Sequence, residues 1–505
     1  MPRRAVFVRA TAAGAPTTAT RVSIGTLAGV VGFLAFVEFT SGVLQGYYTP
    51  MLTDIARHLD IHDADVNWLE GTQLMLSALV VPAFAKLGDM IGHKRMLLIS
   101  TAITAAASFV LPFTDSFAVF LVGWALMGFY VVWLPLEIAL IWSRARRMEG
   151  RSTITARAAG FLVAALESGA IIGALVGGAL VDALPLSVVL LVPAVMIVIC
   201  FFVVLFGVRE SPEPTGGVFD TVGVVLISIA LIAFTGGLSL LRLNGPGDLL
   251  SWIVVLLGIA LVVPFVLWEL RQDDPLIDVR MFRSPALGPV FLTAGLFGVS
   301  VLGAQAPLST FARTDPAVYG YGLGTSGFAT SLIIGIYLIA MIAGALAFPL
   351  AARLISPRIT LIVAAVLVGV GFLLFVPLHA AYLQVIVNMV IVGIGSGALV
   401  AALPAAAASA AAHTQTGVAT GLTNSVKTVG GAIASCVFGI ALLQGVTHAG
   451  GADSTAGSFA GYVTVWVVCG ATALVAAVLL LVVPKTAFSD QHTGHADTRD
   501  AEPIV

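Results

Sequence analysis

Acidic side chains in the middle of long apolar stretches are the residues of this sequence best suited to chemistry. Glu38, Glu137 and Glu167 are each flanked by apolar residues, with no Lys or Arg at comparable depth in the first six stretches. Without a cation nearby, removal from water favours the neutral carboxyl over the carboxylate. Such a group can take up a proton on one side of a membrane and release it on the other. The three acids are therefore candidates for moving protons or for binding a cationic substrate.

Each acid also has a plainer interpretation. Glu38 and Glu167 could be neutral hydrogen-bond donors to neighbouring helices. Glu137 lies about two helical turns before Arg144, so its carboxyl could reach the membrane surface or pair there. Glu38 is the strongest of the three candidates because it lies in the middle of its apolar stretch.

Four further side chains inside apolar stretches could contact a substrate. Trp124 could stack on a flat or cationic ligand, or it could serve as packing or as an interfacial anchor. Gln73, Gln305 and Asn388 are lone amides that either meet the substrate or form hydrogen bonds between helices.

The segment from His58 to Asp65 carries side chains that could bind a metal, but it has a simpler explanation. We expect Asp63 or Asp65 to cap the helix that begins near Trp68. No metal site is predicted. The sequence also has no phosphate-binding glycine loop of the P-loop type, and we expect no cofactor.

The composition predicts an integral membrane protein. Of the 505 residues 59% are hydrophobic and 10% are charged, against roughly 25% charged in soluble domains. This excludes a soluble enzyme and a disordered scaffold, and the net charge of −2 argues against nucleic-acid binding. A helix needs about 20 apolar residues to cross a bilayer. Fourteen stretches qualify, at 24–48, 67–87, 95–113, 117–142, 155–182, 186–208, 219–241, 250–270, 286–309, 325–353, 358–378, 382–411, 417–445 and 460–484.

The distribution of basic residues predicts the orientation. With fourteen crossings both tails lie on one side, and all of the 24 basic residues except Arg57, Arg242 and Arg313 fall on or near that side. The positive-inside rule makes that side cytoplasmic. The first 22 residues have no apolar core of signal-peptide length and read as a tail.

An internal repeat indicates two related halves. Segments Pro82–Leu87 and Pro349–Leu354 both read Pro-x-x-x-basic-Leu at the predicted cytoplasmic edge. Repeated halves around a central cavity are a common build of secondary transporters. The predicted organisation is a tail (1–22), a six-helix bundle (23–209), an inserted helix pair (210–285), a second six-helix bundle (286–485) and a tail (486–505).

The loop Ala85–Arg95, AKLGDMIGHKR, resembles the G-x-x-x-D-R-x-G-R-R signature of the major facilitator superfamily. Asp89, Gly92, Lys94 and Arg95 match it. The resemblance implies that these residues, with the nearby Arg144, latch a cytoplasmic gate.

Span 155–182 contains GAIIGALVGG, which resembles a signature of drug/proton antiporters, with Ala174 in place of a proline. Small residues four apart let helix backbones approach closely, and we assign this role to Gly169, Gly173, Gly177 and Gly178. Segments Phe219–Gly223, Phe265–Leu287 and Thr416–Ala432 resemble the fourteen-helix branch of those antiporters. That branch has an arginine where this sequence has Trp124.

The resemblance implies an all-α polytopic membrane protein with the major facilitator fold, two six-helix bundles plus two inserted helices. It implies a proton-coupled exporter of hydrophobic or amphiphilic compounds, of the multidrug efflux type, in the inner membrane. The expected partners are a small-molecule substrate, protons and the lipid bilayer, and we expect a monomer. Trp124 in place of arginine keeps an alternative open, a facilitator or exporter of a lipid, sugar or endogenous metabolite with different coupling. A membrane-embedded enzyme is disfavoured, because no catalytic set is visible.

Overall fold

The computed structural model describes the two helical halves and the insert between them. The described residues are 24–145, 151–210, 219–273, 275–411, 415–444 and 455–482, and all regular structure in them is helical. The predicted tails, 1–22 and 486–505, lie outside the described residues.

Every predicted apolar stretch forms a helix or a pair of helices. In the described residues, thirteen helical segments are long and apolar enough to cross a membrane, and α1 adds a helix of 24 residues. The ends agree with the predicted ones to within about one helical turn. The unbroken helices are α1 (Ile24–Tyr47), α3 (Val66–Ile91), α4 (His93–Val110), α7 (Arg151–Val181), α8 (Leu186–Gly207), α9 (Thr221–Asn244), α15 (Gly327–Leu354), α16 (Pro357–Leu374), α17 (Tyr382–Ala410), α18 (Thr416–Leu443) and α19 (Phe459–Val482).

Three crossings are interrupted, and two short helices lie outside the crossings. A 3₁₀ turn, η4 (Gly128–Val132), joins α5 (Phe117–Met127) to α6 (Trp133–Ala145). The other interrupted crossings are α10 (Leu249–Ala260) with α11 (Val262–Glu269), and α12 (Gly288–Val301) with α13 (Gln305–Arg313). The short helices are α2 (Leu52–His58) and α14 (Pro316–Tyr319).

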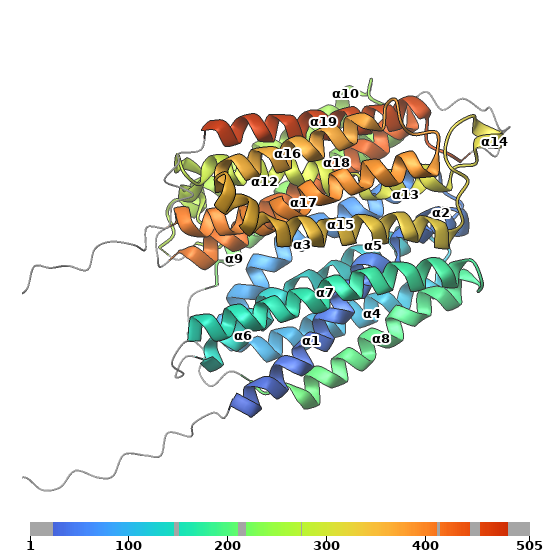
Figure 1. Ribbon diagram of the computed structural model, residues 1–505. Helices are drawn as coiled ribbons and strands as arrows, with labels where there is room; N and C mark the ends of the chain where they lie inside the picture. Colours follow the sequence, from blue (N-terminus) through green and yellow to red (C-terminus); the bar gives the residue numbers. More distant parts are fainter. Residues whose placement is uncertain are drawn as a thin grey trace, which may run out of the picture.

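The helices form two bundles with separate hydrophobic cores. One core consists almost entirely of residues between Leu34 and Val208, and the other almost entirely of residues between Met281 and Leu480. We call them the N-terminal bundle (α1–α8) and the C-terminal bundle (α12–α19); Figure 1 shows them as lower and upper layers. They meet where α7 packs on α15 and where α3 packs on α18.

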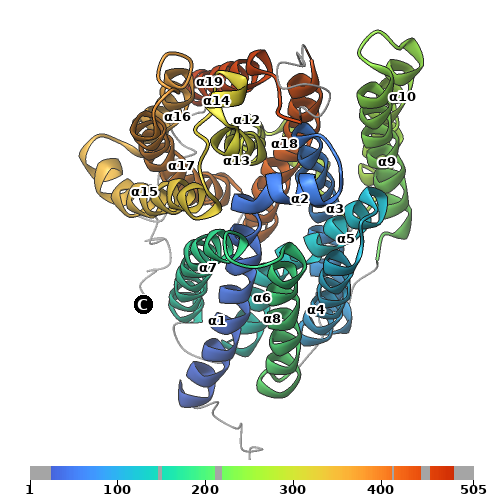
Figure 2. The ribbon, with the colours of Figure 1, turned by 90° about the vertical axis from the view of Figure 1, so that its right-hand side faces the viewer.

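The inserted helices α9 and α10–α11 lie side by side at the edge of the molecule, next to α3 and α18 (Figure 2). Arg242 at the end of α9 holds them there through an ion pair with Asp65, with 2.5 Å between nitrogen and oxygen. The Arg242 guanidinium also lies 5.5 Å from the centre of the Phe117 ring. The insert is therefore anchored to the N-terminal bundle while it touches a helix of each bundle.

Helix α1 begins and α19 ends at the same end of the molecule (Figure 1). We call this end the termini side and the other end, which carries α2 and α14, the opposite side. An even number of crossings requires this arrangement.

The predicted aspartate cap near Trp68 was wrong. Asp65 precedes α3, but its side chain makes no capping hydrogen bond and pairs instead with Arg242. The local capping acceptor is His62, whose Nδ1 accepts a hydrogen bond from the Ala64 N–H. The Asp65 carboxylate thus pairs with a cation from a distant helix in place of a backbone N–H of α3.

Candidate functional site

Glu38 of α1 and Glu137 of α6 lie in the core of the N-terminal bundle. Both are 0% exposed, and none of their four carboxylate oxygens has a hydrogen-bond partner among the described residues. The two carboxyls are within electrostatic range of one another. The plainer interpretation of Glu38, a hydrogen bond to a neighbouring helix, is absent among the described residues, and Glu137 makes no pairing contact there either. Burial of a carboxyl without a partner disfavours its charged form, so for both groups the neutral form has the lower free energy in this conformation.

Two further polar groups belong to the same region and escaped the sequence reasoning. Glu70 of α3 and Tyr130 of η4 interact electrostatically, and Tyr130 also interacts with Glu38. Glu70 lies three residues inside the predicted stretch 67–87. An acidic residue within an apolar stretch was the feature that could have identified it as a candidate. At the start of the η4 turn that carries Tyr130, the Ser77 hydroxyl lies 3.0 Å from the Gly128 carbonyl and 2.8 Å from the Gln73 carbonyl, and its proton is shared between them.

Glu167 of α7 faces the C-terminal bundle and not the other acids. Its side chain is half-buried, and its Oε2 is buried without a hydrogen-bond partner in the described structure. Lys427 of α18 is the cation with which it interacts. The prediction of acids without a nearby cation holds for the helices of the first half, but the other bundle supplies the missing charge. Lys427 was overlooked although it lies in the middle of a predicted crossing.

Trp124 is enclosed by aromatic rings. It is 1% exposed, its ring lies 5.9 Å from Phe120 in a stacked arrangement, and Tyr48 meets it edge-on at 5.0 Å. In this conformation the indole fills the core of the N-terminal bundle and does not face a cavity.

The three predicted amides lie on different helices and are not brought together. Asn388 is fully buried, and its Nδ2 donates to the Leu378 carbonyl at 2.8 Å while its Oδ1 has no partner among the described residues. Gln73 is buried against Gly128, whose lack of a side chain permits the close approach. Gln305 begins α13 and is half-buried.

The predicted gate residues surround a carboxylate that was not predicted. Gly92 has φ +112°, a conformation that glycine adopts readily. This turn aims the backbone N–H groups of Lys94 and Arg95 at Glu210, with hydrogen bonds of 3.0 and 3.1 Å. An acidic side chain at a helix N-terminus is favoured by the helix dipole. Glu210 therefore fixes the start of α4 on the termini side.

The other gate contacts also stay inside the N-terminal bundle. Asp89 lies 3.2 Å from the Nε2 of His93, and Arg144 donates to the carbonyl of Arg209. These described contacts form a network on the termini side, between residues of the N-terminal bundle. The role of these residues as a gate stays a prediction.

The glycines of α7 hold it against two other helices. A Cβ on Gly169, Gly173 or Gly177 would run into the backbone of α1 at Phe39, Val43 or Tyr47. Gly178 is turned toward α15, where a Cβ would lie 2.5 Å from the Gly327 carbonyl oxygen. The glycine stripe therefore packs α7 within its own bundle, and its last member packs α7 on the other bundle.

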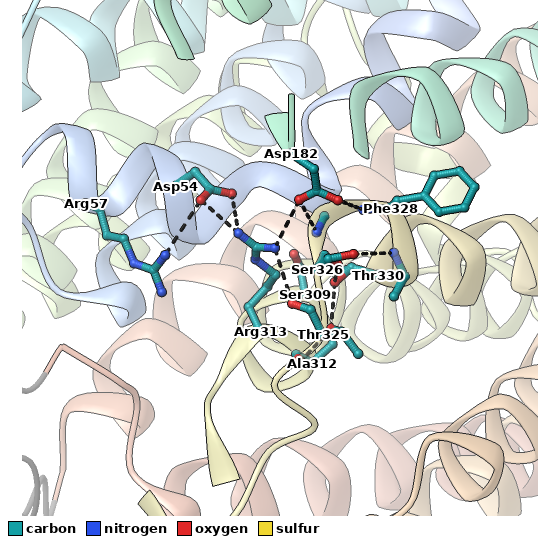
Figure 3. A network of polar contacts seen from close by, with 12 residues as sticks. Asp54, Arg57, Asp182, Ser309, Ala312, Arg313, Thr325, Ser326, Phe328 and Thr330 are labelled. Atoms are coloured by element: carbon teal, nitrogen blue, oxygen red, sulfur yellow. Dashed lines mark hydrogen bonds and ion pairs between the residues drawn. The ribbon is translucent and has the colours of Figure 1, made fainter. Parts of the chain in front are cut away.

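On the opposite side, one arginine joins the two bundles (Figure 3). Arg313 of α13 binds both carboxylate oxygens of Asp54 of α2 at 2.8 Å and lies 3.8 Å from Asp182 at the end of α7. Asp182 in turn accepts hydrogen bonds of 2.8 Å from the N–H groups of Gly327 and Phe328 at the start of α15. We call Asp54, Arg313 and Asp182 the outer latch.

The two carboxylates of the outer latch respond differently to their surroundings. Burial raises the pKa of Asp54 above its usual value, against the opposing pull of Arg313 and Arg57. Burial would also raise the pKa of Asp182, but the N–H groups of Phe328 and Gly327, with help from Ser326 and Arg313, outweigh it and hold that pKa below its usual value. Asp182 therefore remains charged while the latch is closed.

Each of the three basic residues that depart from the positive-inside pattern lies close to an aspartate. Arg57 lies 3.7 Å from Asp54, Arg313 binds Asp54, and Arg242 binds Asp65. Their charges are neutralised locally on the opposite side.

A cavity of about 420 Å³ lies between the insert and the helices α3 and α18. Its lining is almost wholly apolar and includes Met75, Phe234, Val263 and Val429. None of the predicted site residues lines it, so it is separate from the acids.

Comparison with known proteins matches residues 34–435 to the Major Facilitator Superfamily. The cephamycin export protein CmcT of Amycolatopsis lactamdurans is 27% identical over 486 residues, which cover 94% of each chain. The tetracenomycin C resistance and export protein of Streptomyces glaucescens is 26% identical over 407 residues, 77% of this chain and 71% of the relative. A solved POT family peptide transporter has a TM-score of 0.64 at 16% identity, covering 90% of this chain and 96% of that one.

The chain thus combines a two-bundle architecture with the loop Ala85–Arg95 and the glycine stripe of α7. Its sequence matches one transporter family over most of its length. The chain belongs to the Major Facilitator Superfamily.

Proposed function

We propose that this protein exports an amphiphilic compound across the inner membrane in exchange for protons, as a carrier and not as an enzyme. The observation that carries the proposal is the burial of Glu38 and Glu137 without any hydrogen-bond partner among the described residues. Such groups are neutral when enclosed and can ionise when a rearrangement exposes them to water. One proton can thus be carried per exposed acid, with Glu167 as a third candidate.

The moving bodies in this proposal are the bundles 23–209 and 286–485, with the insert 210–285 at their edge. The outer latch holds the bundles together on the opposite side. On the termini side, the described gate contacts lie within the N-terminal bundle. With the latch joining the bundles on the opposite side, a carrier in this conformation accepts its substrate from the termini side.

The direction follows if the termini side is cytoplasmic, as the basic residues predict. Substrate would enter from the cytoplasm, and protons would enter from outside once the latch opens. The names of the two relatives, both export proteins, support this direction. We propose that the protein works as a monomer, because each chain contains both bundles.

Proteoliposomes with trapped pyranine test proton coupling. The probes are naphthalene amphiphiles with anionic, neutral and cationic head groups, and the drive is an imposed pH gradient. We expect Glu38→Gln and Glu137→Gln to reduce probe-dependent proton movement at least tenfold while the protein stays folded. Asp115→Asn is the matched control, because that side chain is 91% exposed on the opposite side. Wild-type rates in both glutamine variants would remove these acids from the mechanism.

A further inference from the structure

We propose that Lys427 is the anion-recognition group of the substrate site, and that the exported compounds are amphiphiles with a carboxylate or a comparable anionic group. This inference rests on the proposed function and names its substrate class. It starts from polar side chains near the interface of the two bundles, three of which carry a buried oxygen that makes no hydrogen bond in the described structure.

Helix register places Glu167 and Tyr337 at the same depth. Helices α7 and α15 run in opposite directions, with Gly178 against Gly327 near the opposite side. Counting inward from that contact, Tyr337 is ten residues along α15 and Glu167 is eleven residues back along α7. The Tyr337 hydroxyl interacts electrostatically with Glu167 and lies near the Ser396 hydroxyl of α17.

Three oxygen atoms in this region are buried without a normal hydrogen bond to the described residues. They are Glu167 Oε2, the Tyr337 hydroxyl and the Ser396 hydroxyl. An unsatisfied buried polar atom costs roughly 1–3 kcal/mol, so such atoms gather where a ligand or water completes them. Lys427 and Glu167 are both half-buried, so part of each residue is accessible from outside the protein.

The sign of the ligand follows from the placement of charge. In the part of the chain that the structure describes, Lys427 is the only basic residue more than about two turns from either end of a crossing helix. A cationic substrate could pair with Glu167 but would face the Lys427 ammonium across the same space. An anionic substrate pairs with Lys427, and the tyrosine and serine hydroxyls can donate to it as well.

The same arrangement couples substrate binding to the relative movement of the two bundles. Glu167 belongs to the N-terminal bundle and Lys427 to the C-terminal bundle, so their electrostatic attraction acts between the bundles. An anion that takes over Lys427 releases Glu167 from this attraction. Lys427 thus binds the substrate, and the loss of its attraction to Glu167 couples substrate binding to the N-terminal bundle.

Binding of two matched probes tests the proposal without any pH gradient. The probes are naphthalene-2-acetate and 2-(2-naphthyl)ethylammonium, which share an aromatic body and differ in charge. Wild-type protein in detergent is expected to bind the anion more tightly. Lys427→Met should weaken anion binding at least tenfold and leave cation binding unchanged or stronger, whereas Lys427→Arg should stay within about threefold of wild type.

Arg353→Met, at the termini-side end of α15, is the control for loss of a positive charge, and thermal unfolding checks that every variant is folded. The proposal is overturned if wild-type protein binds the anion no better than the cation, or if Lys427→Met binds the anion as wild type does. Because no gradient is used, a failure here is distinct from a failure of proton coupling, which the Glu38 and Glu137 variants report.

Discussion

Replacement of Arg313 by glutamine should open the opposite side of the molecule. The arginine binds Asp54 through two contacts of 2.8 Å, donates to the Thr325 carbonyl at 3.2 Å and lies 3.8 Å from Asp182. Its side chain is 10% exposed and that of Asp54 is 20% exposed, which places the pair between a surface and a buried ion pair. Loss of the cation should cost the closed state about 2–3 kcal/mol. This corresponds to about a 30- to 150-fold shift toward the open state.

Distances between two spin labels on the opposite side measure the shift. Cysteines at Leu184, after α7, and at Val318, in α14, place one label on each bundle, and both sites are exposed. Wild-type protein should give one short distance, and Arg313→Gln should add a longer one that becomes the major population. The three native cysteines, all buried, are replaced by alanine: Cys200, Cys436 and Cys469.

Arg57→Gln is the matched control for this experiment. Arg57 also faces Asp54, but at 3.7 Å and with 60% of its side chain exposed, and exposed pairs contribute about 0–1 kcal/mol. It should leave the short distance dominant. An unchanged distance distribution in Arg313→Gln, or equal opening in the two variants, would refute the assignment of Arg313 as the latch.

Two further predictions follow from named contacts. Gly177→Leu should lower the free energy of unfolding by about 2–3 kcal/mol, because its side chain would meet the Tyr47 backbone. Gly160→Leu, with no atom within 4 Å of its Cβ position, should be nearly neutral, and equal melting temperatures of the two variants would contradict this. The lowered pKa of Asp182 stabilises the closed latch above its usual value of about 3.9 and loses that effect as the pH falls through the lowered pKa. The contribution of Asp182, measured as the difference in label distance between wild type and Asp182→Asn, should therefore persist from pH 8 to pH 5 and be lost only below about pH 4. A difference that disappears at a higher pH would show that Asp54, whose pKa is raised, sets the pH response of the latch.

The crossing helices could be predicted from the sequence because the bilayer imposes one strong rule. A backbone in hydrocarbon must satisfy its own hydrogen bonds, so every long apolar stretch becomes a helix. The interruption at Gly128 could not be predicted in the same way. The Gly128 carbonyl there meets the hydroxyl of Ser77, 51 residues away, which also donates to the Gln73 carbonyl. The amino-acid composition around Gly128 does not indicate that contact.

The acids of the candidate site were also visible in the sequence, because a charge in hydrocarbon is costly enough to stand out. Their partners were harder to find. Glu210 follows the end of α8 and meets α4 through backbone N–H groups, which have no sequence signature. Lys427 is 260 residues from Glu167, and only the packing of the two bundles brings them into electrostatic range.

The basic residues that depart from the positive-inside rule indicate tertiary contacts, which the rule itself does not predict. A basic residue on the opposite side must be neutralised or solvated there, so an isolated one predicts a nearby acid. Arg313 and Arg242 are such residues, and each binds an aspartate from a different part of the fold. Arg242 fastens the insert to α3, and Arg313 fastens one bundle to the other. Where a sequence rule based on the membrane fails, the exception therefore marks a tertiary contact, and here those contacts join the insert and the C-terminal bundle to the N-terminal bundle.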